Sequence, residues 1–488
     1  MLHWEDSAAA DAGIFTQIAD MQPIPLFGTA QQSKSSTSTA QRHLNLYAEI
    51  VPEAEKSRLV FYGTPGLALR AGLSLGDTPI RGWIAVGSLY YLVHRGTFYE
   101  VNNAGIKTNR GAVGTTSGRV DMAYDGTLIL LTTGTNMYTY TIASTTFAVV
   151  ADADAPQTAR TCAWLDGQFI VDDGVDDEFF ISADGTTWNA LDFATAESAP
   201  DGIVRVFADN GEVCLFGEST MEYWGNVGAA DFPFQTIKGA IQEFGLAARW
   251  SLTKFNSGLA GLMKNKQGQV QVMFIRGYAP QPISTPELDS TVNNYSSVSD
   301  ATAYAYMLSG HPMLQINFPT PSKSWLYDAS TGMWSPLEYG LNGARHRGEM
   351  QLDFLNKTLI SDYSTGDIYE LDPDVYTDNG TAIVREIVGR HIFNGSQRMT
   401  VDELYCDIET GVGLVSGQGS NPQAMLQISK DNGHTWGNEL WADMGKIGKY
   451  LTRVAWRRLG QARDWLFRIR VTDPVKIVIT YAALRARS

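Results

Sequence analysis

Two short segments of the chain share a turn motif that could belong to a carbohydrate-active protein. The pattern S-x-D-x-G-x-T-W, known as an Asp box, runs from Ser429 to Trp436, and a copy one residue shorter runs from Ser182 to Trp188. Sialidase-type propellers and other carbohydrate enzymes carry such turns. The motif contains no catalytic group, because its Asp accepts backbone N–H bonds and its Trp packs beneath the hairpin. We therefore interpret these residues as structural turns: Ser182, Asp184, Gly185, Trp188, Ser429, Asp431, Gly433 and Trp436.

The other groups that such an enzyme needs are not indicated by the sequence. A sialidase-like site requires a cluster of arginines for a carboxylate and a Tyr–Glu nucleophile pair. Arginines are rare before residue 394, and no spacing singles out three of them. The seven histidines form neither HxH nor HExxH, and the chain has no P-loop and no GxGxxG that opens a helix. We expect no catalytic residues, no enzyme activity and no cofactor.

One acidic run is a candidate for a metal site. Asp172 to Glu178 holds several carboxylates, which Ca²⁺ prefers, but it lacks the spaced D-x-D-x-D pattern of an EF-hand loop. Such runs also form solvated hairpin tips whose charges discourage edge pairing. The three cysteines, Cys162, Cys214 and Cys406, are widely separated and have no CxxC spacing, which argues against zinc or a disulfide framework. We predict a hairpin tip without metal, and a cation site is the alternative.

Basic and aromatic residues concentrate near the C-terminus. Six arginines between residues 453 and 470 are interleaved with Trp456, Trp465 and Phe467. Arg and Trp are enriched at the hot spots of protein interfaces, and they also contact nucleic acid. Strand alternation alone would place the arginines outward and the aromatic rings inward. We favour a protein interface and keep the other two interpretations open. The candidate partner-contact residues are Arg453, Arg457, Arg458, Arg463, Arg468 and Arg470.

The charge is unevenly distributed along the chain. The formal net charge is −15, but residues 394–488 hold 13 Lys and Arg against 9 Asp and Glu, whereas residues 1–393 hold 24 against 43. The acidic part would repel nucleic acid, although DNA could pass such a wall without binding. No apolar run approaches the roughly 18 residues of a membrane span. The N-terminus lacks a signal-peptide pattern, so we expect folding in a cytoplasm.

A repeat sets the expected architecture. A turn residue followed by an alternating apolar strand, a second turn and an aromatic-rich strand recurs with spacings of 39, 41, 44, 57, 42 and 46 residues. The apolar alternation has period two, which excludes a helical solenoid and predicts propeller blades, because one blade cannot bury both of its faces alone. Seven copies predict about seven blades, with six or eight as alternatives. The copies begin at Gly87, Gly126, Gly167, Gly211, Gly268, Gly310 and Asn356.

The flanking regions complete an all-β prediction. We expect an extended N-terminal arm over residues 1–58, with a Ser/Thr tract at Gln31–Thr39, and the β-propeller over residues 59–393. A strand within Leu59–Leu73 would close the ring against the last blade, and Tyr278–Tyr295 would be a loop. Residues 394–488 would form a C-terminal β-sandwich or jelly-roll-like domain.

Motifs at both ends of the chain resemble one protein family. The segments Arg42–Glu49 and Leu59–Leu67 are similar to the pattern R-x-x-N-x-Y-x-E … L-Y-G-T-P-G-L of tail-hub proteins of short-tailed phages, also called packaged-DNA stabilisation proteins. Ala48 stands where the family often has proline. The resemblance brackets residues 42–482, and the ring between the motifs matches in pattern only. The similar C-terminal runs are Ile428–Trp436, Gly445–Lys446 and Arg457–Asp464.

The resemblance implies a structural protein of the virion tail that assembles in the host cytoplasm. Members of this family form a ring, typically a homo-hexamer, below the portal and its adaptor. They hold the DNA channel shut with a needle or plug and carry tailspikes or fibres for genome ejection. DNA would pass the lumen without sequence-specific binding, and neither catalysis nor membrane insertion is implied. A carbohydrate-binding or sialidase-like propeller remains the alternative function.

Overall fold

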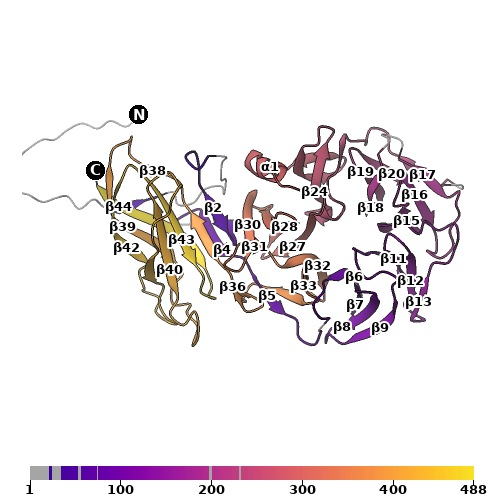
Figure 1. Ribbon diagram of the computed structural model, residues 1–488, viewed down its shortest axis with the longest axis horizontal. Coiled ribbons are helices and arrows are strands. Elements are labelled where there is room, and N and C mark those ends of the chain that lie inside the picture. The colour runs from indigo at the N-terminus through magenta and orange to yellow at the C-terminus, as the bar shows by residue number, and fades with distance from the viewer. Residues whose placement is uncertain are drawn as a thin grey trace, which may run out of the picture.

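The computed structural model describes residues 21–24, 35–52, 56–73, 75–196, 201–229 and 232–487. Within these ranges the chain is all-β, as predicted, apart from one α-helix, α1 (Pro286–Asn293), and one 3-10 turn, η1 (Arg249–Ser251). The strands form a ring of sheets and, at one side of the ring, a separate pair of sheets (Figure 1). Residues 31–34 of the predicted Ser/Thr tract lie outside the described ranges.

The first four sheets of the ring each contain four antiparallel strands in chain order. Consecutive hairpins produce this order, because each strand pairs with the next along the chain. The first two sheets comprise β6 (Ile80–Val86), β7 (Leu89–His94), β8 (Thr97–Asn102), β9 (Lys107–Ala112), β10 (Asp121–Tyr124), β11 (Leu128–Thr132), β12 (Met137–Thr141) and β13 (Thr146–Val149). The next two comprise β14 (Cys162–Leu165), β15 (Gln168–Asp172), β16 (Glu178–Ser182), β17 (Phe193–Thr195), β18 (Ile203–Asp209), β19 (Glu212–Gly217), β20 (Met221–Asn226) and β21 (Phe234–Thr236).

Two further sheets of the ring have five strands each. One contains β22 (Phe244–Leu246), β23 (Thr253–Phe255), β24 (Gly258–Asn265), β25 (Val270–Arg276) and β26 (Ala279–Pro282). The other contains β27 (Thr302–Leu308), β28 (His311–Phe318), β29 (Lys323–Asp328), β30 (Met333–Tyr339) and β31 (Ala344–Arg345). The prediction of a loop over Tyr278–Tyr295 is wrong, because this segment holds β26 and α1. The Thr285 hydroxyl caps the helix, and Leu288 and Val292 bury its inner face.

The last sheet closes the ring with a strand from the beginning of the chain. It contains β32 (Gly348–Phe354), β33 (Lys357–Asp362), β34 (Ile368–Asp372), β5 (Gly66–Leu69), β35 (Thr377–Asp378) and β36 (Thr381–Ala382). β5 pairs antiparallel with β34, and β32 contacts β6 of the first sheet. The predicted closing strand is therefore confirmed over Gly66–Leu69, the C-terminal part of the expected stretch.

Apolar clusters between neighbouring sheets hold the ring together. Within the described residues, each of seven buried clusters joins two sheets that are adjacent in the ring. The cluster that joins the last sheet to the first contains Leu359, Ile368, Tyr90 and Leu92. Each sheet thus covers its neighbour, which is how a propeller removes from water the faces that a single blade leaves open.

The repeat residues mark left-handed turns. Gly87, Gly126, Gly167, Gly211, Gly268, Gly310 and Asn356 all have positive φ values, from 60° to 105°. Six of them join the first and second strands of a sheet, where a tight hairpin needs this conformation. Gly268 instead joins β24 and β25, and the corresponding first turn of that sheet is at Asn256 and Ser257, with φ values of 44° and 61°. The turn at Gly268 is therefore the second turn of its sheet, one hairpin after the position that the repeat predicts.

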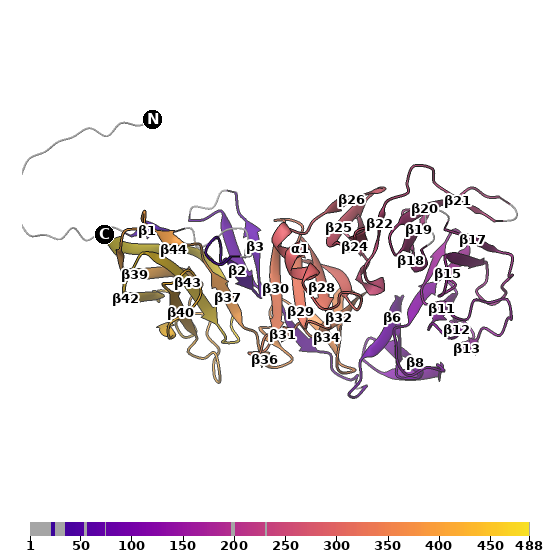
Figure 2. The same cartoon turned by 45° about the horizontal axis from the view of Figure 1, so that its top comes forward.

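The two sheets beside the ring form a β-sandwich that takes strands from both ends of the chain (Figure 2). One sheet contains β1 (Gln22–Pro23), β3 (Leu46–Ile50), β4 (Leu59–Gly63), β44 (Val478–Arg487), β39 (Met399–Ile408) and β42 (Ala455–Ala462). The other contains β2 (Arg42–Leu44), β37 (Arg385–Val388), β38 (Ile392–Phe393), β43 (Asp464–Val471), β40 (Gln423–Ser429) and β41 (Leu440–Asp443). Their shared core includes Leu46, Leu404, Leu426 and Trp465.

The sandwich crosses the expected boundaries at residues 58 and 393. β2 and β3, from the expected arm, and β4, β37 and β38, from the expected propeller range, are all part of its sheets. Ser35–Thr39 form a turn whose Ser36 carbonyl accepts a hydrogen bond of 2.8 Å from His391 Nε2. The sequence predicts residues 42–58 in an extended arm and a ring-closing strand within Leu59–Leu73. The structure instead places β2, β3 and β4 in the sandwich.

Candidate functional site

Four of the six predicted arginines belong to two clusters, each centred on a glutamate of the sandwich. Glu403, on β39, has 7% of its side chain exposed and lies 3.1 Å from Arg457 and 3.6 Å from Arg453. Arg485 of β44 approaches the same carboxylate at 3.7 Å. Arg457 and Arg453 are 66% and 51% exposed, so this cluster presents a net positive charge to solvent.

The second cluster is more deeply buried. Glu386, on β37, has 1% of its side chain exposed and accepts hydrogen bonds from both Nε and Nη2 of Arg470, at 3.1 and 2.6 Å. Arg42 lies 3.3 Å from the same carboxylate and Arg468 lies 4.0 Å away. The Arg468 guanidinium also stacks 4.2 Å from the Trp436 ring centroid. Arg468 and Arg470 therefore act first as internal partners of a buried carboxylate.

Strand alternation places the aromatic residues of the Arg/Trp segment inward, whereas Arg458 is at an irregular position of β42, with a φ of 58°, and Arg463 is in the turn between β42 and β43. Arg458 and Arg463 are exposed, while Trp456, Trp465 and Phe467 are 3%, 0% and 1% exposed and belong to the sandwich core. The aromatic rings thus contribute no contact surface. The exposed arginines remain available for a partner.

A loop that the sequence analysis did not single out adds apolar surface beside the Glu403 cluster. Between β41 and β42, Ile447, Tyr450 and Leu451 are 58%, 71% and 101% exposed. Tyr450, Leu451 and Arg453 line a cavity of about 540 Å³ together with Tyr405 and Tyr481. Large exposed apolar side chains grouped in this way are typical of protein contact surfaces. We call Ile447, Tyr450, Leu451, Arg453 and Arg457 the sandwich-edge surface.

Both Asp boxes are hairpin turns in the structure. Asp184 accepts hydrogen bonds from the backbone N–H groups of Thr186 and Thr187, at 2.8 and 2.7 Å. Asp431 accepts from the hydroxyl and the N–H of Thr435, at 2.5 and 2.9 Å, and from the Ser429 hydroxyl at 2.7 Å, and these bonds lower the pKa of Asp431 to about 2. Trp188 is 4% exposed and packs in the core of the ring. The two carboxylates are already engaged by their own turns.

The acidic run does not gather ligands for a metal. Asp172 is buried and accepts bonds from the N–H groups of Arg160 and Thr161 and from the Thr161 hydroxyl. Asp173 accepts from the N–H of Val175 and of Asp176. Within the described residues, no group of three or more His, Cys, Asp and Glu side chains is arranged to hold a metal ion. In the same residues, no helix is long and apolar enough to cross a membrane.

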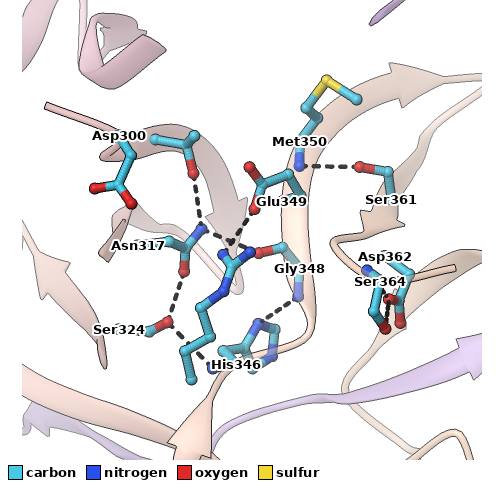
Figure 3. A network of polar contacts seen from close by, with 12 residues as sticks. Asp300, Asn317, Ser324, His346, Gly348, Glu349, Met350, Ser361, Asp362 and Ser364 are labelled. Carbon is cyan, nitrogen blue, oxygen red and sulfur yellow. Dashed lines mark hydrogen bonds and ion pairs between the residues drawn. The ribbon is translucent and has the colours of Figure 1, made fainter. Parts of the chain in front are cut away.

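A buried polar network joins the last two sheets of the ring (Figure 3). Asn317 donates to the Gly348 carbonyl at 3.0 Å, Ser324 donates to Asn317 at 2.7 Å, and the His346 N–H donates to Ser324 at 3.1 Å. The Gly348 N–H donates back to His346 Nδ1 at 3.1 Å, so this ring nitrogen is unprotonated. Burial lowers the pKa of His346 to about 4, which keeps the imidazole neutral. The network fixes β32, which lines the centre of the ring.

A cavity of about 300 Å³ lies at that centre. Its walls come from β6, β10, β18, β23, β27 and β32, one strand from each of six sheets. Arg119, Arg205 and Trp250 line it together, although they are far apart in the sequence. No spacing in the sequence could have indicated this grouping.

The closed ring joined to a sandwich defines the class of the protein, a β-propeller with a β-sandwich built from both chain ends. The chain belongs to the phage P22 Gp10 family: residues 22–376 match the family model described as "Bacteriophage P22 Gp10, beta-propeller" and residues 384–487 match "Bacteriophage P22 Gp10, beta-sandwich". The resemblance expected from the flanking motifs is thereby confirmed.

Individual relatives are more distant. The chain is similar to the tail hub protein gp10 of Salmonella phage P22, with 23% identity over 303 residues, which is 59% of this chain and 61% of that protein. Among solved structures, YCF48 from Cyanidioschyzon merolae covers 63% of this chain and 99% of its own, with 12% identity and a TM-score of 0.42. The WD40 β-propeller domain of Doa1 covers 62% and 96%, with 13% identity and a TM-score of 0.39. Because both TM-scores are below 0.5, the fold assignment rests on the sheets and the family match.

Proposed function

We propose that the chain is a structural tail-hub protein of a short-tailed bacteriophage, with no enzymatic role. The observation that carries this proposal is the match of both domains, in order, to the Gp10 family. The likeness to the tail hub protein of phage P22 supports it, and that likeness spans about three fifths of each chain. The Asp-box carboxylates are engaged by their own turns, which favours the structural function over the sialidase-like alternative.

The proposed assembly is a homo-oligomeric ring of six copies, by analogy with the family. In it, the sandwich-edge surface of one copy contacts the acidic propeller of the next. Leu451 and Tyr450 provide apolar area, and Arg453 and Arg457 provide positive charge. Residues 1–393 hold 43 Asp and Glu against 24 Lys and Arg, so the two surfaces have opposite charge. Electrostatic complementarity of this kind steers association and sets its register.

In the virion tail, such a ring would lie below the portal and adaptor, hold the needle or plug, and carry spikes or fibres. DNA would pass through the lumen between copies without sequence-specific contacts, because the acidic propellers repel the phosphate backbone. Assembly would take place in the host cytoplasm. Six propellers arranged around a common axis would thereby stabilise the packaged genome until ejection.

Mass photometry and negative-stain electron microscopy of the purified chain with its adaptor test this proposal. We expect rings of subunits, which Leu451→Asp and Arg457→Glu shift at least tenfold toward monomer. Phe393→Asp is the matched control, because Phe393 is 66% exposed on β38 of the sandwich and is not part of the sandwich-edge surface. A chain that stays monomeric with the adaptor and is absent from virions would overturn the tail-hub assignment. Rings that are unaffected by both sandwich-edge substitutions would overturn the proposed contact.

A further inference from the structure

Two arginines flank one tryptophan in the central cavity of the propeller. The guanidinium carbons of Arg119 and Arg205 lie 5.3 and 5.2 Å from the Trp250 ring centroid. Arg119 precedes β10, Arg205 is on β18, and Trp250 belongs to η1, so three separate sheets converge on this point. Two like charges beside one ring repel each other, and the arrangement therefore favours a negative charge between them.

Three residues that line this cavity have a buried hydrogen-bond donor without an acceptor in the described part of the chain. Nη1 of Arg119, Nε of Arg205 and the hydroxyl of Tyr304 are buried and accept or donate no hydrogen bond within the described residues. Tyr304 as a whole is 4% exposed, and its hydroxyl is close to Gly348, where an added Cβ would lie 2.3 Å from it. A buried donor without an acceptor costs about 1–3 kcal/mol. Three of them around one cavity point to a ligand that brings acceptors.

The local charge selects the kind of ligand. Burial lowers the pKa of both Arg119 and Arg205, yet a guanidinium remains protonated at neutral pH. Asp121, which lines the same cavity, is held by the Cys162 N–H at 3.2 Å and offsets one of the two positive charges. Lys254 is balanced by Asp209 at 3.6 Å. The net local charge of +1 matches a monoanion better than a dianion.

The cavity also has room and apolar surface for an organic body. Met350, Val120, Leu252 and Ala303 line it beside the Trp250 ring. Small-molecule sites combine apolar walls of this kind with a few placed polar groups. A guanidinium fork matches the planar geometry of a carboxylate.

We propose that the propeller cavity binds a small organic monocarboxylate, which Arg119 and Arg205 hold by its carboxylate and Trp250 holds by its ring or carbon skeleton. The Tyr304 hydroxyl donates to the same ligand. This site is separate from the sandwich-edge surface, and it does not depend on assembly into a ring.

Saturation-transfer NMR and thermal shifts on the full chain test the site, with D-glucuronate and benzoate as carboxylate probes. D-glucose, benzamide and inorganic phosphate are the neutral and dianionic comparisons. We expect saturable binding of at least one carboxylate probe, at least tenfold weaker binding by Arg119→Gln and Arg205→Gln, and several-fold weaker binding by Tyr304→Phe. Arg276→Gln is the matched control, since Arg276 is exposed at the end of β25.

A second measurement separates ligand binding from a structural role of Arg119. Because Arg119→Gln removes a charge whose buried Nη1 has no hydrogen-bond partner among the described residues, it should raise the melting temperature of the free chain while abolishing the shift caused by the carboxylate. Absence of binding by both carboxylate probes, binding that Arg119→Gln leaves unchanged, tighter binding of phosphate, or a lowered melting temperature of the free variant would each overturn the proposal.

Discussion

The propeller and the sandwich are both built from antiparallel sheets, but they are stabilised differently. In the propeller, each apolar cluster joins two sheets that are adjacent in the ring, and acidic residues outnumber basic ones in residues 1–393. In the sandwich, one core joins strands from both chain ends, and each sheet carries a glutamate surrounded by three arginines. The propeller is thus a repetition of local contacts, whereas the sandwich depends on contacts between distant segments.

The difference has a functional consequence under the proposed assembly. A ring in which a buried core joins each sheet to its neighbours is suited to be a rigid spacer. The sandwich exposes Tyr450, Leu451 and several arginines, so it is suited to bind a neighbour. Two features should show the difference between the regions most clearly when they are removed. One is β5, the long-range strand of the propeller, and the other is the buried charge of the sandwich.

The largest effect is expected from the strand that closes the ring. Leu67 on β5 is fully buried against Tyr304 and Tyr369, and Leu67→Ala should lower the free energy of unfolding by about 3–5 kcal/mol, since it leaves a cavity in the core. Leu69→Ala, on the same strand but 49% exposed, should change it by less than about 0.5 kcal/mol. Urea unfolding of the two variants measures this contrast. Equal, small effects would mean that β5 does not hold the ring closed.

The next largest effect concerns the buried charge of the sandwich. Glu386→Gln leaves Arg42, Arg468 and Arg470 without their shared carboxylate and should cost about 3 kcal/mol, because the arginines remain part-buried. The propeller offers a matched control in Glu370→Gln, whose partner Lys357 lies 2.6 Å away and is 46% exposed. That exposed pair should contribute less than about 1 kcal/mol. Thermal unfolding at two salt concentrations checks both values, and a cost at Glu386 no larger than at Glu370 would contradict the comparison.

The same contrast explains how much of the fold the sequence could predict. The propeller could be predicted from the sequence because strand alternation and turn glycines are local signals. The position predicted for the fifth repeat, Gly268, is wrong because η1 interrupts the first strand of that sheet between β22 and β23. The first hairpin turn of the sheet is therefore at Asn256. Helix α1 was missed although Thr285 and Pro286 form a recognisable helix start. The sheet that β2 joins could not be predicted, because its contact between Arg42 and Glu386 links residues that are 344 positions apart in the sequence.

The candidate sites could be predicted only as far as local sequence patterns indicate them. The concentration of arginines after residue 452 is visible in the sequence, but which of them are neutralised depends on Glu386 and Glu403 in neighbouring strands. The meeting of Arg119 and Arg205 follows from ring closure alone, and no local pattern encodes it. Exposure of Leu451 likewise depends on the packing of the loop that carries it.

The third prediction concerns how acid changes the stability of the protein. It compares a buried histidine that has no hydrogen-bond partner among the described residues with one that belongs to a hydrogen-bond network. His43 on β2 is fully buried, its two ring nitrogens have no hydrogen-bond partner within the described residues, and burial lowers its pKa to about 3. Above pH 6.5 it is neutral in both folded and unfolded chains. Below that pH only the unfolded chain gains the proton, so stability falls, by about 2 kcal/mol at pH 5.

His43→Leu should therefore be as stable as the parent at pH 7 and lose less stability between pH 6.5 and 4. His346→Leu, in the propeller, should instead be less stable already at pH 7, because the Gly348 N–H and the Gln315 side chain lose their acceptor. Chemical unfolding at pH 7, 6 and 5 measures both variants, with His434→Leu as the exposed control. An unchanged pH slope in His43→Leu would remove this residue from the acid response.

The smallest effect tests whether the repeat glycines report backbone conformation alone. Gly211 has a φ of 82°, and a Cβ built on it would meet no atom within 4 Å. Gly211→Ala should therefore cost about 1 kcal/mol, from the left-handed conformation and not from a clash. Asn356, at the same place in the last sheet with a φ of 62°, tolerates this conformation, so Asn356→Gly should change stability by less than about 0.5 kcal/mol. Calorimetry of both variants decides, and a cost well above 1 kcal/mol at Gly211 would show that the turn also makes contacts that its glycine protects.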